Sequence, residues 1–184
     1  MLRFTNSSVS RPPELGALRG FTARLGARLR VCREGDLSAL EWMGLYTGHR
    51  DVIHQTFARQ QAGEALMLLG VANDFPVAQV WLDLAGRGST ECPWLWAFRV
   101  FPPLQRLGIG SWILGAAEQV ARARGARHIE LGAEPGNARA VRVYERLGYR
   151  AIGPRIELAR RGPDGRPLAT SVELVIMRRN LPAR

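Results

Sequence analysis

The sequence contains no lysine: its 26 Lys and Arg positions are all arginine, against 16 Asp and Glu, and the formal net charge is +10. The absence of lysine excludes a nucleoside-triphosphate loop of the type G-x-x-x-x-G-K-[ST], because that loop needs a lysine to reach the phosphates. The arginines are spread along the whole chain without interleaved aromatic residues, so we interpret them mainly as solvated helix faces. A nucleic-acid surface is the alternative, and only the net charge favours it.

Cysteine is scarce, and long apolar segments are missing. Cys32 and Cys92 lie far apart and belong to no metal or redox motif, so we expect reduced thiols. No apolar stretch approaches the roughly 20 residues that span a bilayer, and the N-terminus has no apolar signal core. We therefore expect a cytoplasmic protein with no metal and no membrane partner.

The 184 residues suit one domain with a single sizeable core. Residues 1–27 are rich in Ser, Pro, Gly and Arg and show little periodicity, so we expect a flexible or peripheral segment there. Residues 28–180 alternate strand and helix patterns. Helices are expected after Asp36 and Asp51, which are good N-caps, and over 109–124 and 137–147. The expected strands are 29–32, 65–72, 77–84, 94–100, 129–133 and a final hairpin of 149–160 and 168–178.

The most informative motif is Gln105-Arg106-Leu107-Gly108-Ile109-Gly110, which lies between the apolar strand 94–100 and an amphipathic helix. Glycines let the backbone turn sharply and approach a ligand, and the first N–H groups of a helix point at an anion. A dinucleotide fingerprint is excluded because Ile113 stands where a third small residue is needed. The motif predicts a cradle for a diphosphate, with tight packing of strand and helix as the alternative.

A second motif follows after one helix and one strand: Asn137-x-x-Ala140-x-x-x-Tyr144-Glu145-x-x-Gly148-Tyr149. Together with Val100-x-Pro102-x-x-Gln105-x-x-Gly108-x-Gly110, it resembles the GNAT superfamily of acyl-CoA-dependent N-acyltransferases over residues 28–180. The resemblance implies an α/β fold with acyl-CoA in a cleft. The implied sheet is mixed and mostly antiparallel, has about seven strands and about four flanking helices, and is splayed between its two central strands.

The resemblance also implies an activity and a cofactor site. The activity is transfer of acetyl from acetyl-CoA to the primary amine of a small molecule, an amino-acid derivative or a peptide end, by direct attack in a ternary complex. In similar proteins the backbone N–H groups of the glycine turn hold the pyrophosphate of CoA, and the edge of the preceding strand binds the pantetheine arm. The implied cofactor-binding residues are Phe98, Val100, Gln105, Arg106, Leu107, Gly108, Ile109, Gly110, Ser111 and Asn137.

Aminolysis of a thioester needs a neutral amine, a stabilised oxyanion and a proton for the departing thiolate. The resemblance implies that Tyr144 is the general acid, and packing on the inner face of its helix is the alternative. Some similar proteins place a carboxylate on the strand before the Asn motif, which makes Glu130 and Glu134 candidates for the general base. Glu91 and Asp83 are further candidates, and for each carboxylate a surface or ion-pair role is the competing interpretation.

The acceptor is less well defined than the donor. In similar proteins the two helices after the first strand and the last hairpin line the acceptor side, which here implies residues 156–160 together with Trp42, Tyr46, His49, His54 and Phe57. The expected partner is an amine, with no specific nucleic acid, and a homodimer is left open. A catalytically silent acyl-CoA-binding sensor or regulatory module is the alternative function.

Overall fold

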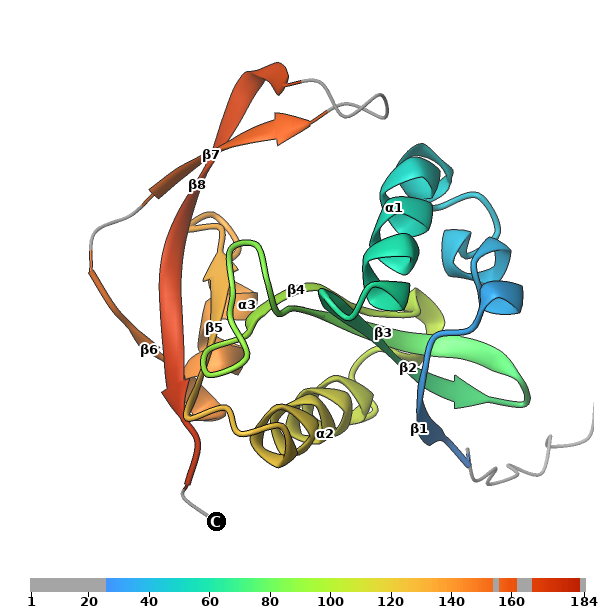
Figure 1. Ribbon diagram of the computed structural model, residues 1–184, viewed down its shortest axis with the longest axis horizontal. Helices are drawn as coiled ribbons and strands as arrows, with labels where there is room; N and C mark the ends of the chain where they lie inside the picture. Colours follow the sequence, from blue (N-terminus) through green and yellow to red (C-terminus); the bar gives the residue numbers. More distant parts are fainter. Residues whose placement is uncertain (1–25, 154–155, 162–166, 183–184) are drawn as a thin grey trace, which may run out of the picture.

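The computed structural model describes residues 26–153, 156–161 and 167–182, and its strands form one sheet in the order β1-β2-β3-β4-β5-β8-β6, with β7 paired to β8 off this path (Figure 1). Most of the segment expected over residues 1–27 lies outside these ranges. The strands are β1 (Arg28–Val31), β2 (Ala65–Ala72), β3 (Phe75–Asp83), β4 (Trp94–Val100), β5 (His128–Ala133), β6 (Arg150–Ala151), β7 (Ile156–Arg161) and β8 (Pro167–Asn180).

Among the described strands only β4 and β5 pair in parallel, which confirms the mixed, mostly antiparallel sheet. The expected strand over 149–160 is divided into β6 and β7. Gly153 follows β6 with a φ of +66°, which takes the chain out of extended geometry. The final hairpin is therefore formed by β7 and β8, while β6 pairs with the far part of β8.

The helical part of the described chain comprises three α-helices and four 3₁₀ segments: α1 (Arg50–Gln61), α2 (Ile109–Ala123), α3 (Ala138–Arg146), η1 (Glu34–Asp36), η2 (Ser38–Glu41), η3 (Thr47–His49) and η4 (Pro102–Leu104). The helix expected after Asp36 is replaced by η1 and η2. Asp36 does not serve as the N-cap of a following helix, because other groups occupy its carboxylate. That carboxylate accepts hydrogen bonds from the Arg30 side chain at 2.5 and 2.7 Å and from the Arg33 N–H at 2.7 Å.

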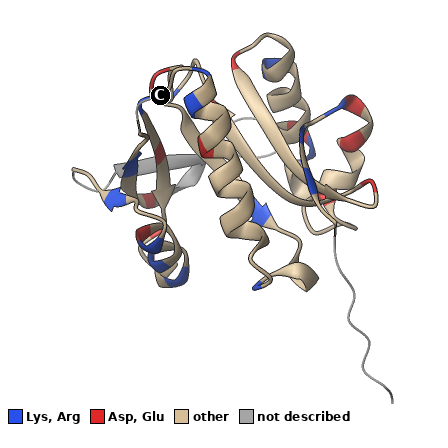
Figure 2. Cartoon of the chain, turned by 90° about the horizontal axis from the view of Figure 1, so that it is seen from below, with Lys and Arg blue, Asp and Glu red and all other residues tan. Residues whose placement is uncertain are grey.

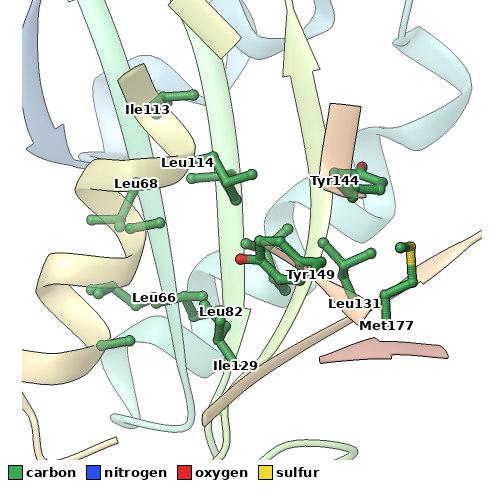
Figure 3. Packing of buried hydrophobic residues seen from close by; sticks show 14 of the residues in the cluster. Leu66, Leu68, Leu82, Ile113, Leu114, Ile129, Leu131, Tyr144, Tyr149 and Met177 are labelled. Carbon is green, nitrogen blue, oxygen red and sulfur yellow. The ribbon is translucent and has the colours of Figure 1, made fainter. Parts of the chain in front are cut away.

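The sheet is covered on both faces, so its central strands are apolar on both sides. Alternate residues of β2 belong to two different clusters: Leu66 and Leu68 pack with α2, whereas Met67 and Leu69 pack with Ile53 of α1. In Figure 1, α1 and β7 rise on the same side of the sheet and α2 lies on the other. Figure 3 shows the α2-side cluster. Burying one such Leu or Ile side chain contributes roughly 1.5–3 kcal/mol, which explains why α2 keeps its apolar stripe toward the sheet.

The sheet opens between β4 and β5, as expected. These strands are paired only at Trp94 with Glu130 and at Leu95 with Leu131. Beyond Leu95, β4 stays paired with β3 and β5 stays paired with β8, so the two strands diverge. A bulge marks the divergence, because Ala97 has a φ of +47° and two residues of β4 lie opposite one residue of β3 there.

Candidate functional site

The turn before α2 has the backbone geometry that the glycines predict. Gly108 is the N-cap of α2 with a φ of +83°, and Arg106 also has a positive φ, of +68°. The first backbone hydrogen bond of the helix runs from the Trp112 N–H to the Gly108 carbonyl at 3.1 Å. The N–H groups of the three residues between them precede that bond, so they are free of intrahelical partners and carry the positive end of the helix dipole.

The turn lies close against β4. The Gln105 side-chain amide donates to the Val100 carbonyl at 3.1 Å. A Cβ atom on Gly110 would lie 3.3 Å from Phe98 Cζ and 3.5 Å from Val100 Cγ2, which is already close contact. Glycine at this position therefore brings the start of α2 against the strand that borders the opening, and Phe98 and Val100 point toward α2.

A cleft of about 920 Å³ lies between β4, the start of α2 and α3. It brings together every residue that the resemblance implies for cofactor binding except Leu107 and Ile109. The Ile109 side chain is buried in the core, and that of Leu107 is 65 % exposed. These two positions contribute backbone N–H groups to the turn rather than side chains to the cleft wall.

Helix α3 forms the opposite wall and is strongly basic. Arg139, Arg142 and Arg146 line the cleft at a helical spacing of three and four, with Arg106 from the turn. None of these four arginines forms an ion pair with a residue of the described ranges. In Figure 2, α3 is the short helix at the lower left, and its ribbon is largely blue. The arginine-rich segment that we interpreted as a solvated helix face is thus also the wall of a cleft suited to phosphates.

Asn137 caps α3, as predicted. Its Oδ1 atom accepts a hydrogen bond from the Ala140 N–H at 3.1 Å, and the residue also lines the cleft. The cap orients the first turn of α3, and the helix in turn places Tyr144 on its inner face. A role of Asn137 toward a ligand stays a prediction.

Tyr144 is packed by its ring and free at its hydroxyl. The ring is 6.1 Å from that of Phe98 and 5.9 Å from that of Tyr149, and the residue is only 8 % exposed. Its hydroxyl makes no hydrogen bond within the described residues, and Figure 3 shows it pointing away from Leu131. Burial raises the pKa of Tyr144 to about 12, so the phenol keeps its proton at neutral and mildly alkaline pH.

Tyr149 lies next to Tyr144, but its hydroxyl is hydrogen-bonded within the protein. Its hydroxyl donates to Glu118 Oε1 at 3.0 Å, and Glu118 Oε2 accepts a further bond from Arg179 at 2.6 Å. The Tyr149 hydroxyl, the Glu118 carboxylate and the Arg179 guanidinium therefore satisfy one another within the protein. The two neighbouring tyrosines therefore differ in one respect: only the hydroxyl of Tyr144 is available to a ligand.

A second cavity, of about 810 Å³, opens on the α1 side between β4 and β5. Its walls include Trp94, Trp96 and the backbone of Gly132, and Phe98 and Tyr144 line both cavities. A ligand in the first cleft and one in the second would therefore meet at these two residues. Sequence reasoning identified the apolar strand that carries the tryptophans but not the cavity they enclose.

The charged residues of the second cavity are paired. Asp83 accepts from Arg59 at 2.9 Å and from the backbone N–H groups of residues 85, 86 and 87 at 2.8–3.2 Å. Burial by itself would raise the pKa of Asp83, but these hydrogen bonds outweigh it and lower the pKa below the usual value. The guanidinium of Arg87 lies 4.2 Å above the Trp94 ring. Asp83 is thus a saturated, ionised structural carboxylate.

The other predicted carboxylates lie outside both cavities. Glu130 accepts two hydrogen bonds from Arg178, at 2.8 Å from Nε and 2.5 Å from Nη2, and lies two residues from Gly132 on the same face of β5. Glu134 is exposed beyond the end of that strand. Glu91 is exposed and paired with Arg127 at 3.1 Å. The structure therefore does not bring these carboxylates to the Phe98–Tyr144 junction.

The predicted acceptor residues are spread over the α1 face and do not line the second cavity. Trp42 is buried, and its indole N–H donates to the Pro76 carbonyl at 2.8 Å. Tyr46 and His49 pack edge to face, with ring centroids 5.6 Å apart. Phe57 packs in the α1-side core, and His54 is exposed. The side chains of residues 156–160 lie outside the described part of the structure.

The described ranges contain neither a cluster of three His, Cys, Asp or Glu side chains suited to a metal ion nor a helix that is long and apolar enough to cross a membrane. Cys32 and Cys92 are free thiols, as expected. Burial raises the pKa of both, to about 12 for Cys32, so neither is activated as a thiolate.

The chain was compared with known proteins. The sequence model described as the acetyltransferase (GNAT) family matches residues 36–149. No curated protein sequence matches the chain. Many solved structures share its fold.

Three of the solved structures show the range of the similarity. The ribosomal-protein-S18-alanine N-acetyltransferase of Escherichia coli is 21 % identical, with a TM-score of 0.65 over 86 % of this chain and 96 % of its own. An N-acetyltransferase from Staphylococcus aureus is 14 % identical, with a TM-score of 0.66 over 85 % and 99 %. An aminoglycoside 6′-N-acetyltransferase complexed with coenzyme A is 15 % identical, with a TM-score of 0.58 over 85 % and 98 %. At these identities the likeness shows the fold alone.

Proposed function

The chain belongs to the acetyltransferase (GNAT) family, whose model matches more than half of its length, and on this premise we propose that it transfers the acetyl group of acetyl-CoA to a primary amine by direct attack in a ternary complex. The acceptor is a small molecule, an amino-acid derivative or a peptide end. The observation that carries the proposal is the meeting of two cavities at Phe98 and Tyr144. We propose residues 28–180 as the acetyltransferase domain.

The first cleft suits coenzyme A by its charge and its backbone. Three free N–H groups at the start of α2 and the arginines of α3 face the same space, which favours the phosphates of the cofactor. The solved structure of a fold relative in complex with coenzyme A supports this choice of cofactor. Beyond Leu95 the edge of β4 that faces the opening is unpaired with β5, so its N–H and carbonyl groups are free for the amides of the pantetheine arm.

Tyr144 is proposed as the donor to the leaving sulfur. A thioester that enters along β4 reaches the junction of the two cavities, where the Tyr144 hydroxyl has no partner among the described residues. Because its pKa is raised to about 12, the phenol carries its proton over the whole useful pH range. It donates a hydrogen bond to the sulfur as negative charge develops there and then supplies the proton that converts the thiolate to the thiol.

The proton of an incoming ammonium needs a different route. Glu130 lies on the same face of β5 as Gly132, which lines the second cavity, so a water molecule is needed to connect it with the amine. Its two hydrogen bonds from Arg178 fix the position of the carboxylate. Glu134, beyond the strand end, is the second candidate in our proposal.

The alternative function is a catalytically silent acyl-CoA-binding module. One observation favours it: neither Glu130 nor Glu134 lines the first cleft or the second cavity. A screen of amines, amino acids and peptides for release of free coenzyme A from acetyl-CoA distinguishes the two functions, with calorimetry of acetyl-CoA binding in parallel. Amine-dependent release of thiol supports the acetyltransferase. Tight binding of acetyl-CoA without release in the presence of any amine supports the silent module.

A further inference from the structure

Arg99 is a half-buried cation in the central strand β4, and no carboxylate of the described ranges contacts it. It makes no hydrogen bond or ion pair with any residue in the described ranges, and its Nη1 atom is buried. By contrast, Arg59 and Arg179, which are also partly buried, each contact a carboxylate. A desolvated guanidinium without an anion is unfavourable for folding. Such a group is retained where a ligand supplies the missing charge.

The bulge in β4 decides which way Arg99 faces. Phe98 and Val100 point toward Gly110 of α2, and Arg99 between them points to the opposite face. There its guanidinium lies 4.3 Å above the Tyr46 ring, on the same side of the sheet as α1. Arg99 also belongs to the residues that line the first cleft. It is not among the residues that line the second cavity, so it borders the opening between β4 and β5 from the α1 face of β4.

Other unpartnered polar groups lie on the same face of β3 and β4. Arg99 is directly opposite Gln79 of β3, and Trp96 is directly opposite Trp81, so the four side chains share one face as two cross-strand pairs. Gln79 is fully buried, and neither its Oε1 nor its Nε2 atom finds a partner within the described residues. The indole N–H groups of both tryptophans are likewise buried without an acceptor there.

The chemistry of these groups selects the ligand. Buried polar atoms in native proteins are nearly always hydrogen-bonded, so a cluster of unsatisfied ones indicates a polar ligand or ordered water that completes it. Four of the five atoms are donors, namely Arg99 Nη1, Gln79 Nε2 and the two indole nitrogens. A set of donors around one cation matches an acceptor-rich anion. Carboxylate is the anion that a guanidinium binds with paired, parallel hydrogen bonds.

We propose that Arg99 binds a carboxylate of the acceptor, so that the acceptor is an amine that carries a free carboxylate, as amino acids and short peptides do. The inference rests on the acetyltransferase activity proposed above. Arg99 directly follows Phe98, which lines both cavities, and the two side chains point to opposite faces of β4. An acceptor whose carboxylate is held at Arg99 therefore reaches the thioester near Phe98 and Tyr144 by extending its amine through the opening between β4 and β5.

The test compares matched acceptors on the wild-type enzyme and on Arg99→Met. The acceptors are the L-amino acids, a set of dipeptides, and the C-terminal primary amide of each. We expect the wild type to use the best acids with a kcat/KM at least about tenfold above that of their amides, and Arg99→Met to lose this preference, since tenfold corresponds to one charge-assisted contact. The readout is the ratio of kcat/KM for each acid to that for its amide, and Arg99→Lys should retain part of the preference.

Thermal unfolding separates a binding role from a structural one. Because Arg99 has no carboxylate partner in the described residues, Arg99→Met should keep or raise the Tm. Arg59→Met is the matched control and should lower the Tm, because it leaves Asp83 without its cation. If Arg99→Met does not fold, Gln79→Met provides the second variant, with a weaker acid preference and an undiminished Tm expected.

The outcomes have distinct meanings. Equal use of acids and amides by the wild type overturns the carboxylate inference and leaves the acetyltransferase proposal intact. A higher Kd for acetyl-CoA in Arg99→Met, with the acid preference retained, assigns the cation to the cofactor and overturns the inference as well. If no amine of either series releases coenzyme A although acetyl-CoA binds, the proposed function fails and the inference falls with it.

Discussion

The first cleft and the second cavity lie on opposite sides of β4 and are built differently. On the α2 side the cleft is lined by backbone N–H groups at the start of α2 and by arginines of α3, which both follow the strand in sequence. On the α1 side the cavity is lined mainly by side chains from β3, β4, β5, β8 and α1. The lining of the first cleft comes from two short sequence motifs. The lining of the second cavity depends on the register between strands and on the bulge in β4. This difference separates the site that we propose for the donor from the site that we propose for the acceptor.

The largest expected effect concerns two neighbouring tyrosines: Tyr144, which lines both cavities, and Tyr149, which is buried in the core. Tyr144→Phe should lower kcat by about 100-fold or more, because a general acid contributes roughly 10²–10⁴, with the Kd for acetyl-CoA and the Tm nearly unchanged. Tyr149→Phe removes the hydroxyl of the neighbouring tyrosine, whose ring centroid is 5.9 Å from that of Tyr144, and should leave kcat unchanged. It should instead destabilise the protein by about 1–2 kcal/mol, because the Glu118 carboxylate loses a buried hydrogen bond. Steady-state kinetics and thermal unfolding measure both.

The pKa of Tyr144 also predicts how kcat depends on pH. Since the pKa of Tyr144 is raised to about 12, its ionisation lies above the working range, and kcat should show no fall from this group below about pH 11. Wild-type turnover in Tyr144→Phe would remove this residue from the mechanism. A loss of turnover in Tyr149→Phe without a change in Tm would reverse the two assignments.

The phosphate turn is tested by placing a negative charge at its centre. Gly110→Asp should weaken acetyl-CoA binding by at least about tenfold, which is 1.4 kcal/mol, because the carboxylate repels the pyrophosphate and its Cβ meets Phe98. The matched control is Gly115→Asp, five residues along α2, where no atom lies within 4 Å of an added Cβ. Calorimetry of both variants measures the difference. Unchanged affinity in Gly110→Asp would contradict the location of the donor site.

The proton route is tested at β5. Glu130→Gln should lower kcat/KM by about tenfold and flatten the acidic limb of its pH profile, as loss of a general base does. Arg178→Gln is the control, since it breaks the same ion pair and leaves the carboxylate in place. Equal rate losses with unaltered pH profiles in both variants would assign Glu130 to the structure rather than to the chemistry.

The smallest expected effect concerns the arginines of α3. Replacing Arg139 and Arg142 together by Gln should raise the Kd for acetyl-CoA about three- to tenfold at low salt, with a smaller difference at 0.5 M salt, because solvated charges are screened. Arg124→Gln, at the end of α2, provides a control that changes net charge away from the cleft. An effect independent of salt would indicate that the arginines shape the helix rather than attract phosphate.

The sequence predictions also divide into those that depend on neighbouring residues and those that depend on contacts between distant residues. The strands from β1 to β5 and the helices α1 and α2 were predictable from apolar periodicity, and the cap at Asn137 from its residue type, whereas the single strand expected over 149–160 is two strands. The helix after Asp36 was wrong, because Arg30 of the preceding strand takes the carboxylate that the cap would need. The second cavity was missed since Trp94 and Trp96, as residues of a strand apolar on both faces, are equally typical of an ordinary core.

By itself the sequence determined the geometry of the glycine turn before α2, because the left-handed conformation at Gly108 and the free N–H groups of a helix start depend only on residues that are adjacent in the chain. The family and the order of the elements follow from the same local motifs. Only the tertiary structure decided that Arg99 and Gln79 face each other without a carboxylate between them. That juxtaposition depends on the register of β3 against β4 and on the bulge at Ala97, and strand register is set by long-range packing that no stretch of neighbouring residues encodes.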